Sequence, residues 1–199
     1  MNEKYDALFT PWKIGNVEVK NRIVLAPMGG TCLFGWMELP HFDKEAAGLI
    51  LNIAQNNCGL VIPGIAPVRS VMGRVWLYQN KKMFSELKDY MKLIHAAGAR
   101  LFIQLTAGFG RSMALPDSMA LLAGNKVLNT LAKPVLDARY LTAAPSELPN
   151  RWADGVQCRP ITKKEIDDIV YAFGEISRLC KEADVDGVEV HAVHEGYLL

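Results

Sequence analysis

The sequence GVEVHAVHEGYLL, from Gly187 to Leu199, decides the fold that we predict for this chain. Its first residues alternate, so that Val188 and Val190 point to one side of a strand while Glu189 and His191 point to the other. In a strand of a closed barrel, one side faces the interior and the other faces the surrounding helices. We therefore expect Glu189 and His191 inside the barrel.

Three earlier apolar runs have the length and composition of buried strands. They are RIVLAP at 22–27, GLVIPG at 59–64 and RLFIQL at 100–105. Segments with helical spacing follow at 41–57 and 81–99, and a further helix is expected to begin after Thr162, because Glu165 three residues on completes a capping box. Strands that alternate with helices predict a parallel sheet covered by helices.

Two architectures fit this order, a doubly wound open sheet and a (β/α)8 TIM barrel. Gln104 and His191 lie near the carboxyl ends of their strands, where barrels build active sites, and this favours the barrel. A barrel needs about 250 residues, so we predict an α/β half barrel in which residues 1–199 form the N-terminal half of the domain. Its apolar edge strand would be uncovered, which favours a homo-oligomer.

The segment at about 106–161 is much longer than an ordinary connection between a strand and a helix. It is rich in proline, alanine and serine. We expect it to form a cap, or lid, over the mouth of the barrel.

The composition favours a small-molecule partner. Of the 199 residues, 50% are hydrophobic and 22% charged, and the formal net charge is +1 without a block of like charges. Neither a nucleic-acid surface nor a basic membrane patch is indicated. The chain shows no apolar stretch of about 20 residues, no secretory signal and no CxxC pair, so we expect a cytoplasmic protein.

His191 and His194 are three residues apart, a spacing that puts them on opposite faces of a continuous strand. They can converge if the strand ends near His191 and a turn follows, for which Gly196 is suited. Together with Tyr197 they could then bind a substrate oxygen and deliver a proton. Metal ligation and ordinary core packing remain alternatives, although the two other histidines lie in predicted helices.

The segment GVEVHAVHEGYLL resembles the fourth-strand motif of the old yellow enzyme family of FMN-dependent oxidoreductases. The resemblance is to the branch with 2,4-dienoyl-CoA reductases, enoate reductases and bile-acid-inducible reductases. Other segments are similar to this family in the same order along the chain. They are LFTPWKIGNVEVKNRIVLAPM, GLVIPGIAP, LFIQLTAGFGR, APSELPNRW and CRPITKKEIDDIVYAF.

The resemblance implies an FMN site. Pro27 and Met28 would line the flavin with backbone groups, Gly64 would allow close approach to the isoalloxazine, and Gln104 would hydrogen-bond its pyrimidine edge. Many members have Thr or Cys two residues after the proline to tune the flavin. This chain has Gly29 there, with Thr31 and Cys32 following, so the tuning side chain is left open.

The resemblance also implies catalytic roles. His191 and His194 would bind the carbonyl or carboxylate oxygen of an α,β-unsaturated substrate. Tyr197 would protonate the α-carbon after hydride reaches the β-carbon from the flavin, although Glu195 displaces this tyrosine by one residue from the shorter family motif. No metal site is expected.

The resemblance implies an ene reductase that uses NAD(P)H as reductant. The alternatives are an amine dehydrogenase or demethylase of the same family, a metal-dependent barrel hydrolase, and an inactive truncated fragment. The loops for the FMN phosphate, a 4Fe-4S cluster and FAD would belong to a longer parent protein.

Overall fold

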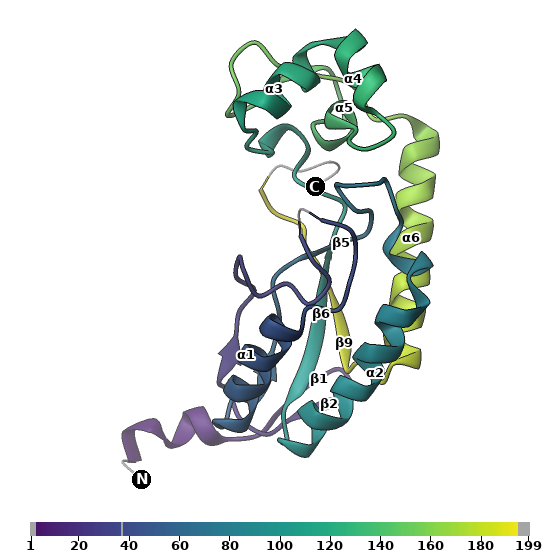
Figure 1. Cartoon of the computed structure of the whole chain (residues 1–199). Helices are drawn as coiled ribbons and strands as arrows, with labels where there is room; N and C mark the ends of the chain where they lie inside the picture. The colour runs from purple at the N-terminus through teal and green to yellow at the C-terminus, as the bar shows by residue number, and fades with distance from the viewer. Residues whose placement is uncertain (1–2, 37, 195–199) are drawn as a thin grey trace.

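The computed structural model describes residues 3–36 and 38–194, and its centre is a parallel sheet with four strand positions. These are β3 (Val24–Leu25), β4 (Leu60–Val61), β6 (Arg100–Thr106) and β9 (Gly187–Val190). Leu60 pairs with Arg100 on one side of β6, and Gly187 pairs with Phe102 on the other. The predicted parallel order is therefore confirmed (Figure 1).

Two strands are shorter than predicted. The run at 59–64 is interrupted after β4 at Pro63, which has no N–H to donate to a neighbouring strand. The chain resumes pairing with β6 at β5 (Ala66–Pro67). Likewise β3 ends before Pro27, so the predicted strand at 22–27 is wrong in extent though right in place.

Three helices run alongside the strands (Figure 1). They are α1 (Lys44–Gln55), α2 (Lys81–Ala96) and α6 (Lys163–Glu182). The α1 helix begins later than expected because Asp43 caps it, accepting hydrogen bonds from two backbone N–H groups. The predicted capping box of Thr162 and Glu165 is present at the start of α6.

The main core lies between these helices and one face of the sheet. Leu101 and Ile103 of β6 belong to it, together with buried residues of all three helices. On the opposite face, Phe102 packs against a smaller cluster that contains Val19, at the end of a hairpin. The hairpin consists of β1 (Trp12–Ile14) and β2 (Val17–Val19), and follows the 3-10 helix η1 (Glu3–Phe9). Successive residues of β6 therefore face opposite sides of the sheet, as barrel strands require.

The long segment after β6 is folded rather than extended. It contains η3 (Gly110–Ser112), α3 (Asp117–Gly124), α4 (Lys126–Ala132), α5 (Ala138–Leu141) and the paired strands β7 (Leu148–Pro149) and β8 (Gln157–Cys158). A small core of Ala123, Ala138 and Val156 holds it together. Figure 1 shows these helices beyond the carboxyl ends of the strands, which is where a cap was expected.

Across the two described ranges, no helix combines the length and the apolar character that a membrane span requires.

Candidate active site

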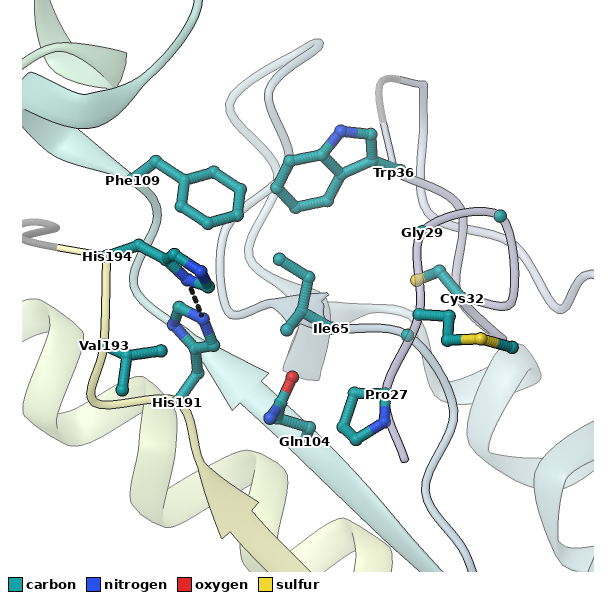
Figure 2. Close-up of a pocket in the computed structure, with 13 residues that line it drawn as sticks. Pro27, Gly29, Cys32, Trp36, Ile65, Gln104, Phe109, His191, Val193 and His194 are labelled. Atoms are coloured by element: carbon teal, nitrogen blue, oxygen red, sulfur yellow. Dashed lines mark hydrogen bonds between the residues drawn. The ribbon is translucent and has the colours of Figure 1, made fainter. Parts of the chain in front are cut away.

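A cavity of about 390 Å³ lies at the carboxyl ends of the strands (Figure 2). It collects every predicted site residue that the structure describes. These are Pro27, Met28, Gly29, Gly64, Gln104, His191 and His194. Tyr197 and Gly196 lie outside the described residues. The strand ends that the sequence marks with polar groups therefore converge on one place.

Gln104 carries an unused acceptor at this cavity. Its Nε2 donates a hydrogen bond to Oε1 of Glu189, the residue beside it in the register of β6 and β9. Its own Oε1 is buried and has no hydrogen-bond partner among the described residues. Leaving a buried acceptor unpaired costs about 1–3 kcal/mol, so a ligand that donates to this oxygen gains the same order of stabilisation.

The two histidines meet as the sequence predicted. The Nε2 atom of His191 lies 2.9 Å from Nδ1 of His194, and the two rings stack with centroids 5.0 Å apart. The strand β9 ends at Val190, and His194 itself adopts the left-handed backbone conformation, with φ of 70°. The chain therefore turns between His191 and His194, and the predicted role of Gly196 falls outside the described residues.

Burial lowers the pKa of the His191 imidazole below its usual value, and the neighbouring His194 lowers that pKa further. His191 is therefore neutral at neutral pH. In the hydrogen bond between the rings one nitrogen donates and the other accepts, so one N–H is shared between the two imidazoles. This shared N–H becomes available to a ligand when the bond between the rings opens.

Aromatic side chains form the wall next to the histidines. The Phe109 ring contacts both imidazoles edge to face, at centroid distances of 5.7 and 5.9 Å. The Trp36 ring in turn lies 5.5 Å from Phe109. Neither aromatic residue was predicted. Phe109 does carry a sequence signal, because glycines on both sides of it take positive φ values and let the chain turn at the strand end.

In the loop after β3, one of the two candidate side chains, Thr31 or Cys32, reaches the cavity. The hydroxyl of Thr31 donates to the Met28 carbonyl and accepts from the Gly64 N–H, both at 2.9 Å, and is thereby buried in the loop. Cys32 lines the cavity instead. Burial raises the pKa of its thiol to about 11, so it is protonated at neutral pH.

Gly64 is required by its contact with the same loop. A Cβ atom at this position would lie 2.4 Å from the Met28 carbonyl oxygen, a distance that forces a displacement. By contrast, Cβ atoms at Gly29 or Gly30 would meet no atom within 4 Å. The open side of the cavity is thus the loop at 29–30, while Gly64 lies where two loops are in close contact.

Metal ligation was an open alternative for the histidine pair. Within residues 3–36 and 38–194, no three His, Cys, Asp or Glu side chains come together as a ligand set.

A parallel α/β sheet with polar and aromatic residues gathered at its strand ends is the architecture of (β/α) barrel enzymes. The chain belongs to the NADH:flavin oxidoreductase / NADH oxidase family, whose sequence pattern matches residues 7–199.

Known relatives agree with this family. The chain is 36% identical to a cinnamate reductase of Clostridium sporogenes over 208 aligned residues, which cover 100% of this chain and 28% of that protein. It is 28% identical to an NADPH dehydrogenase of Listeria welshimeri, with 96% and 49% covered. The old yellow enzyme structure from Trypanosoma cruzi superposes with a TM-score of 0.65 at 20% identity, over 98% of this chain and 53% of that one. The chain thus spans about half or less of these proteins.

The residues present fit the ring system of a flavin. The pyrimidine edge of a flavin has an N–H donor, which is what the unpaired Oε1 of Gln104 requires. Gly29 and Gly30 line the same cavity and carry no side chain that would occupy it. The histidine pair lies at the other side of the same cavity (Figure 2).

Proposed function

We propose that the protein containing this chain is an FMN-dependent ene reductase that reduces α,β-unsaturated carbonyl compounds, enoates or enoyl-CoA thioesters with NAD(P)H as reductant. The observation that carries the proposal is the placement of the unpaired Gln104 acceptor and the His191 and His194 pair in one cavity. When bound there, reduced FMN would supply the hydride for the substrate β-carbon.

Gln104 would hold the pyrimidine edge of the flavin through its Oε1, while Glu189 keeps the amide oriented by accepting from its Nε2. Pro27, Met28 and Gly29 would line the ring from the first strand end. The Cys32 thiol is the side chain of this loop that reaches the cavity, which supports it as the flavin-tuning group over Thr31.

His191 and His194 would bind the substrate oxygen and stabilise the negative charge that develops on it. Opening the hydrogen bond between the rings would give that oxygen a donor from each. Tyr197 is proposed as the proton donor to the α-carbon, on the strength of its sequence position alone, because it lies outside the described residues.

The wider setting is also part of the proposal. Residues 1–199 would form the N-terminal half of the barrel, and the helices at 106–161 would act as its cap. The four cysteines are free thiols, which supports a reducing cytoplasm. An exposed sheet edge, with Val190 53% exposed, supports self-association of the isolated chain. Any 4Fe-4S cluster or FAD would bind outside residues 1–199.

The test is to express the full reading frame, record the visible spectrum, and reduce the protein anaerobically with NADH or NADPH. A bound flavin that is reduced and then reoxidised by an enone or by cinnamate is expected. Reoxidation by none of these acceptors, together with reduction by a secondary or tertiary amine, would instead identify the amine dehydrogenase alternative. A full-length protein without flavin would contradict both.

A further inference from the structure

The helix α6 runs alongside the sheet, so one of its faces packs on the core and the other points outward (Figure 1). Its buried residues include Ile169, Ile176 and Leu179, which belong to the main core. Because residues three and four apart share a helix face, the opposite face carries a regular row of exposed positions. This outer row consists of Lys163, Asp167, Tyr171, Gly174, Arg178 and Glu182.

Gly174 of the outer row has no role that packing within the described chain explains. It lies in the interior of α6, a helix of 20 residues, where glycine is destabilising relative to alanine. A Cβ atom at this position would meet no atom of the described residues within 4 Å. The missing side chain therefore leaves a notch on the outward face of the helix.

Tyr171 lies one turn before this notch and projects from the same face. Its side chain is 59% exposed. The ring of Tyr78 contacts it edge to face, with the ring centroids 5.8 Å apart, which restrains the Tyr171 ring. Tyrosine is among the residue types that contribute most to protein–protein contacts. The outer row thus places a restrained aromatic side chain beside a notch.

A second copy of α6 fits this face when the two helices run antiparallel. With a two-fold axis midway between Tyr171 and Gly174, the tyrosine of each copy lies over the glycine of the other. The absence of a Cβ atom at Gly174 allows the two helices to approach closely. In such a symmetric interface every contact occurs twice.

The charges of the outer row are complementary about the same axis. Asp167 lies opposite Arg178 of the second copy, and Lys163 lies opposite Glu182. Within one copy, the Lys163 ammonium lies 3.1 Å from the Asp167 carboxylate, and Arg178 pairs with Glu182. Each end of the helix pair therefore has four charges that alternate in sign around a ring. Such a network contributes more than isolated exposed ion pairs do.

The charges also select against a parallel arrangement. A parallel two-fold pair would place Lys163 against Lys163 and Arg178 against Arg178, which is repulsive. The antiparallel pair has one facing position of like charge, Lys164 opposite Lys181. Lys164 already pairs with Asp168 at 2.8 Å, which offsets this repulsion.

We infer that the outer row of α6 is an interface for a second copy of this chain, paired antiparallel about the midpoint between Tyr171 and Gly174. The pairing does not use the exposed sheet edge and is independent of the proposed function. A single pair of helices buries less surface than a permanent dimer does, so the association is reversible, with a dissociation constant of about 10 µM.

The experiment is sedimentation of the full-length protein at concentrations from about 1 to 100 µM. The wild type should associate reversibly over this range. Gly174→Leu should weaken the association at least about tenfold, because the new side chain occupies the notch that receives Tyr171. The melting temperature of this variant, measured at low concentration, should equal or exceed that of the wild type, because leucine favours a helix more than glycine does.

A charge exchange tests the antiparallel register. Asp167→Arg and Arg178→Asp should each weaken association at least about tenfold, because each places like charges opposite one another in both symmetric contacts. An equimolar mixture of the two variants should associate as the wild type does, because position 167 of one then faces an opposite charge at position 178 of the other. A mixture that does not recover would overturn the antiparallel pairing.

The matched controls are Asp89→Arg and Ser85→Leu, at exposed positions of α2. Asp89 resembles Asp167 in pairing with a lysine of its own helix, at 2.7 Å. Both controls should leave the dissociation constant within about twofold of the wild type. A wild type whose mass does not change with concentration would overturn the inference. So would an association that the test variants and the controls affect equally, since another surface would then be responsible.

Discussion

His191 Nε2 and His194 Nδ1 lie 2.9 Å apart, so each imidazole is the hydrogen-bond partner of the other. A substrate oxygen that takes two donors from this pair must replace that bond. The hydrogen bond between the rings holds both imidazoles in position before a ligand binds, so the pair is preorganised. The shared N–H becomes available when the ligand replaces this bond.

Replacing either histidine should affect turnover more than flavin binding. For His191→Ala and His194→Ala we expect kcat/KM for an enone to fall about 10²- to 10³-fold, since each removes one donor to the developing negative charge. The visible flavin spectrum and flavin content should stay as in the wild type. Loss of flavin in either variant would instead place the pair in the cofactor site.

The affinity for carboxylate ligands should depend on pH, with a predictable sign. The lowered pKa of His191 leaves this imidazole neutral at neutral pH, and an anionic ligand favours its protonated form. Binding of 3-phenylpropionate should therefore tighten as pH falls, by up to about tenfold per unit, until His191 is protonated without ligand. The uncharged ketone 4-phenyl-2-butanone should show little pH dependence. Spectral titration of both ligands between about pH 5.5 and 8.5 checks this, and parallel profiles would refute it.

Gln104→Leu should weaken flavin binding. The substitution removes the buried acceptor and leaves Glu189 without its donor, so we expect the dissociation constant of FMN to rise at least about tenfold. The measurement is fluorescence titration of the flavin-free protein. Gln157→Leu, at an exposed glutamine of β8, is the control and should bind flavin as the wild type does.

Gly64→Ala should destabilise the protein by about 1–3 kcal/mol, because its Cβ would overlap the Met28 carbonyl oxygen and force two loops apart. Gly174→Ala is a matched control on the exposed side of α6, where an added Cβ meets no atom within 4 Å. That change should instead stabilise by about 0.5–1 kcal/mol, because alanine favours a helix interior. Urea unfolding of the flavin-free proteins gives both values, and equal shifts would show that the contact at Gly64 is unimportant.

Glu165 should make stability fall in acid. Burial alone raises the pKa of this carboxyl, but hydrogen bonds from Arg159 and Thr162 outweigh burial and lower the pKa to about 2. The stabilisation is thus present above the ordinary pKa of 4.5 and is lost as pH falls from there towards 2. Glu165→Gln should lower the unfolding free energy at pH 7 by about 1 kcal/mol and flatten this part of the stability profile. An unchanged profile would count against the assignment.

Much of the site follows from the sequence because barrels place their chemistry at strand carboxyl ends. Gln104 and His191 carry that signal directly, since Gln104 is a polar residue near the end of an apolar strand and His191 directly follows another. The Thr162 and Glu165 spacing likewise predicts where α6 begins. These predictions depend on local patterns, which tertiary packing leaves intact.

The remainder depends on contacts between distant segments. The rings of Trp36 and Phe109 are in contact because the loops after β3 and β6 fold against each other. A contact between residues so far apart in the sequence cannot be predicted from a local pattern. The helices of the cap escape prediction for a different reason. Several of their large apolar residues are exposed, such as Leu131 at 74%. The spacing of apolar residues therefore does not indicate a buried helix face there. The contact of Gly64 with the Met28 carbonyl also depends on tertiary packing.

The hydroxyl of Thr31 has a consequence for how this cavity can change over evolutionary time. It joins the Met28 carbonyl to the Gly64 N–H, so the loops after the first two strand positions behave as one mechanical unit. An insertion in either loop would disrupt the Thr31 hydrogen bonds that hold the other loop, so substitutions in one loop require compensating changes in the other. Position 32 lies outside that pair of bonds and its side chain lines the cavity, so under the proposed function a new side chain there would change the surroundings of the flavin while the Thr31 bonds stay in place.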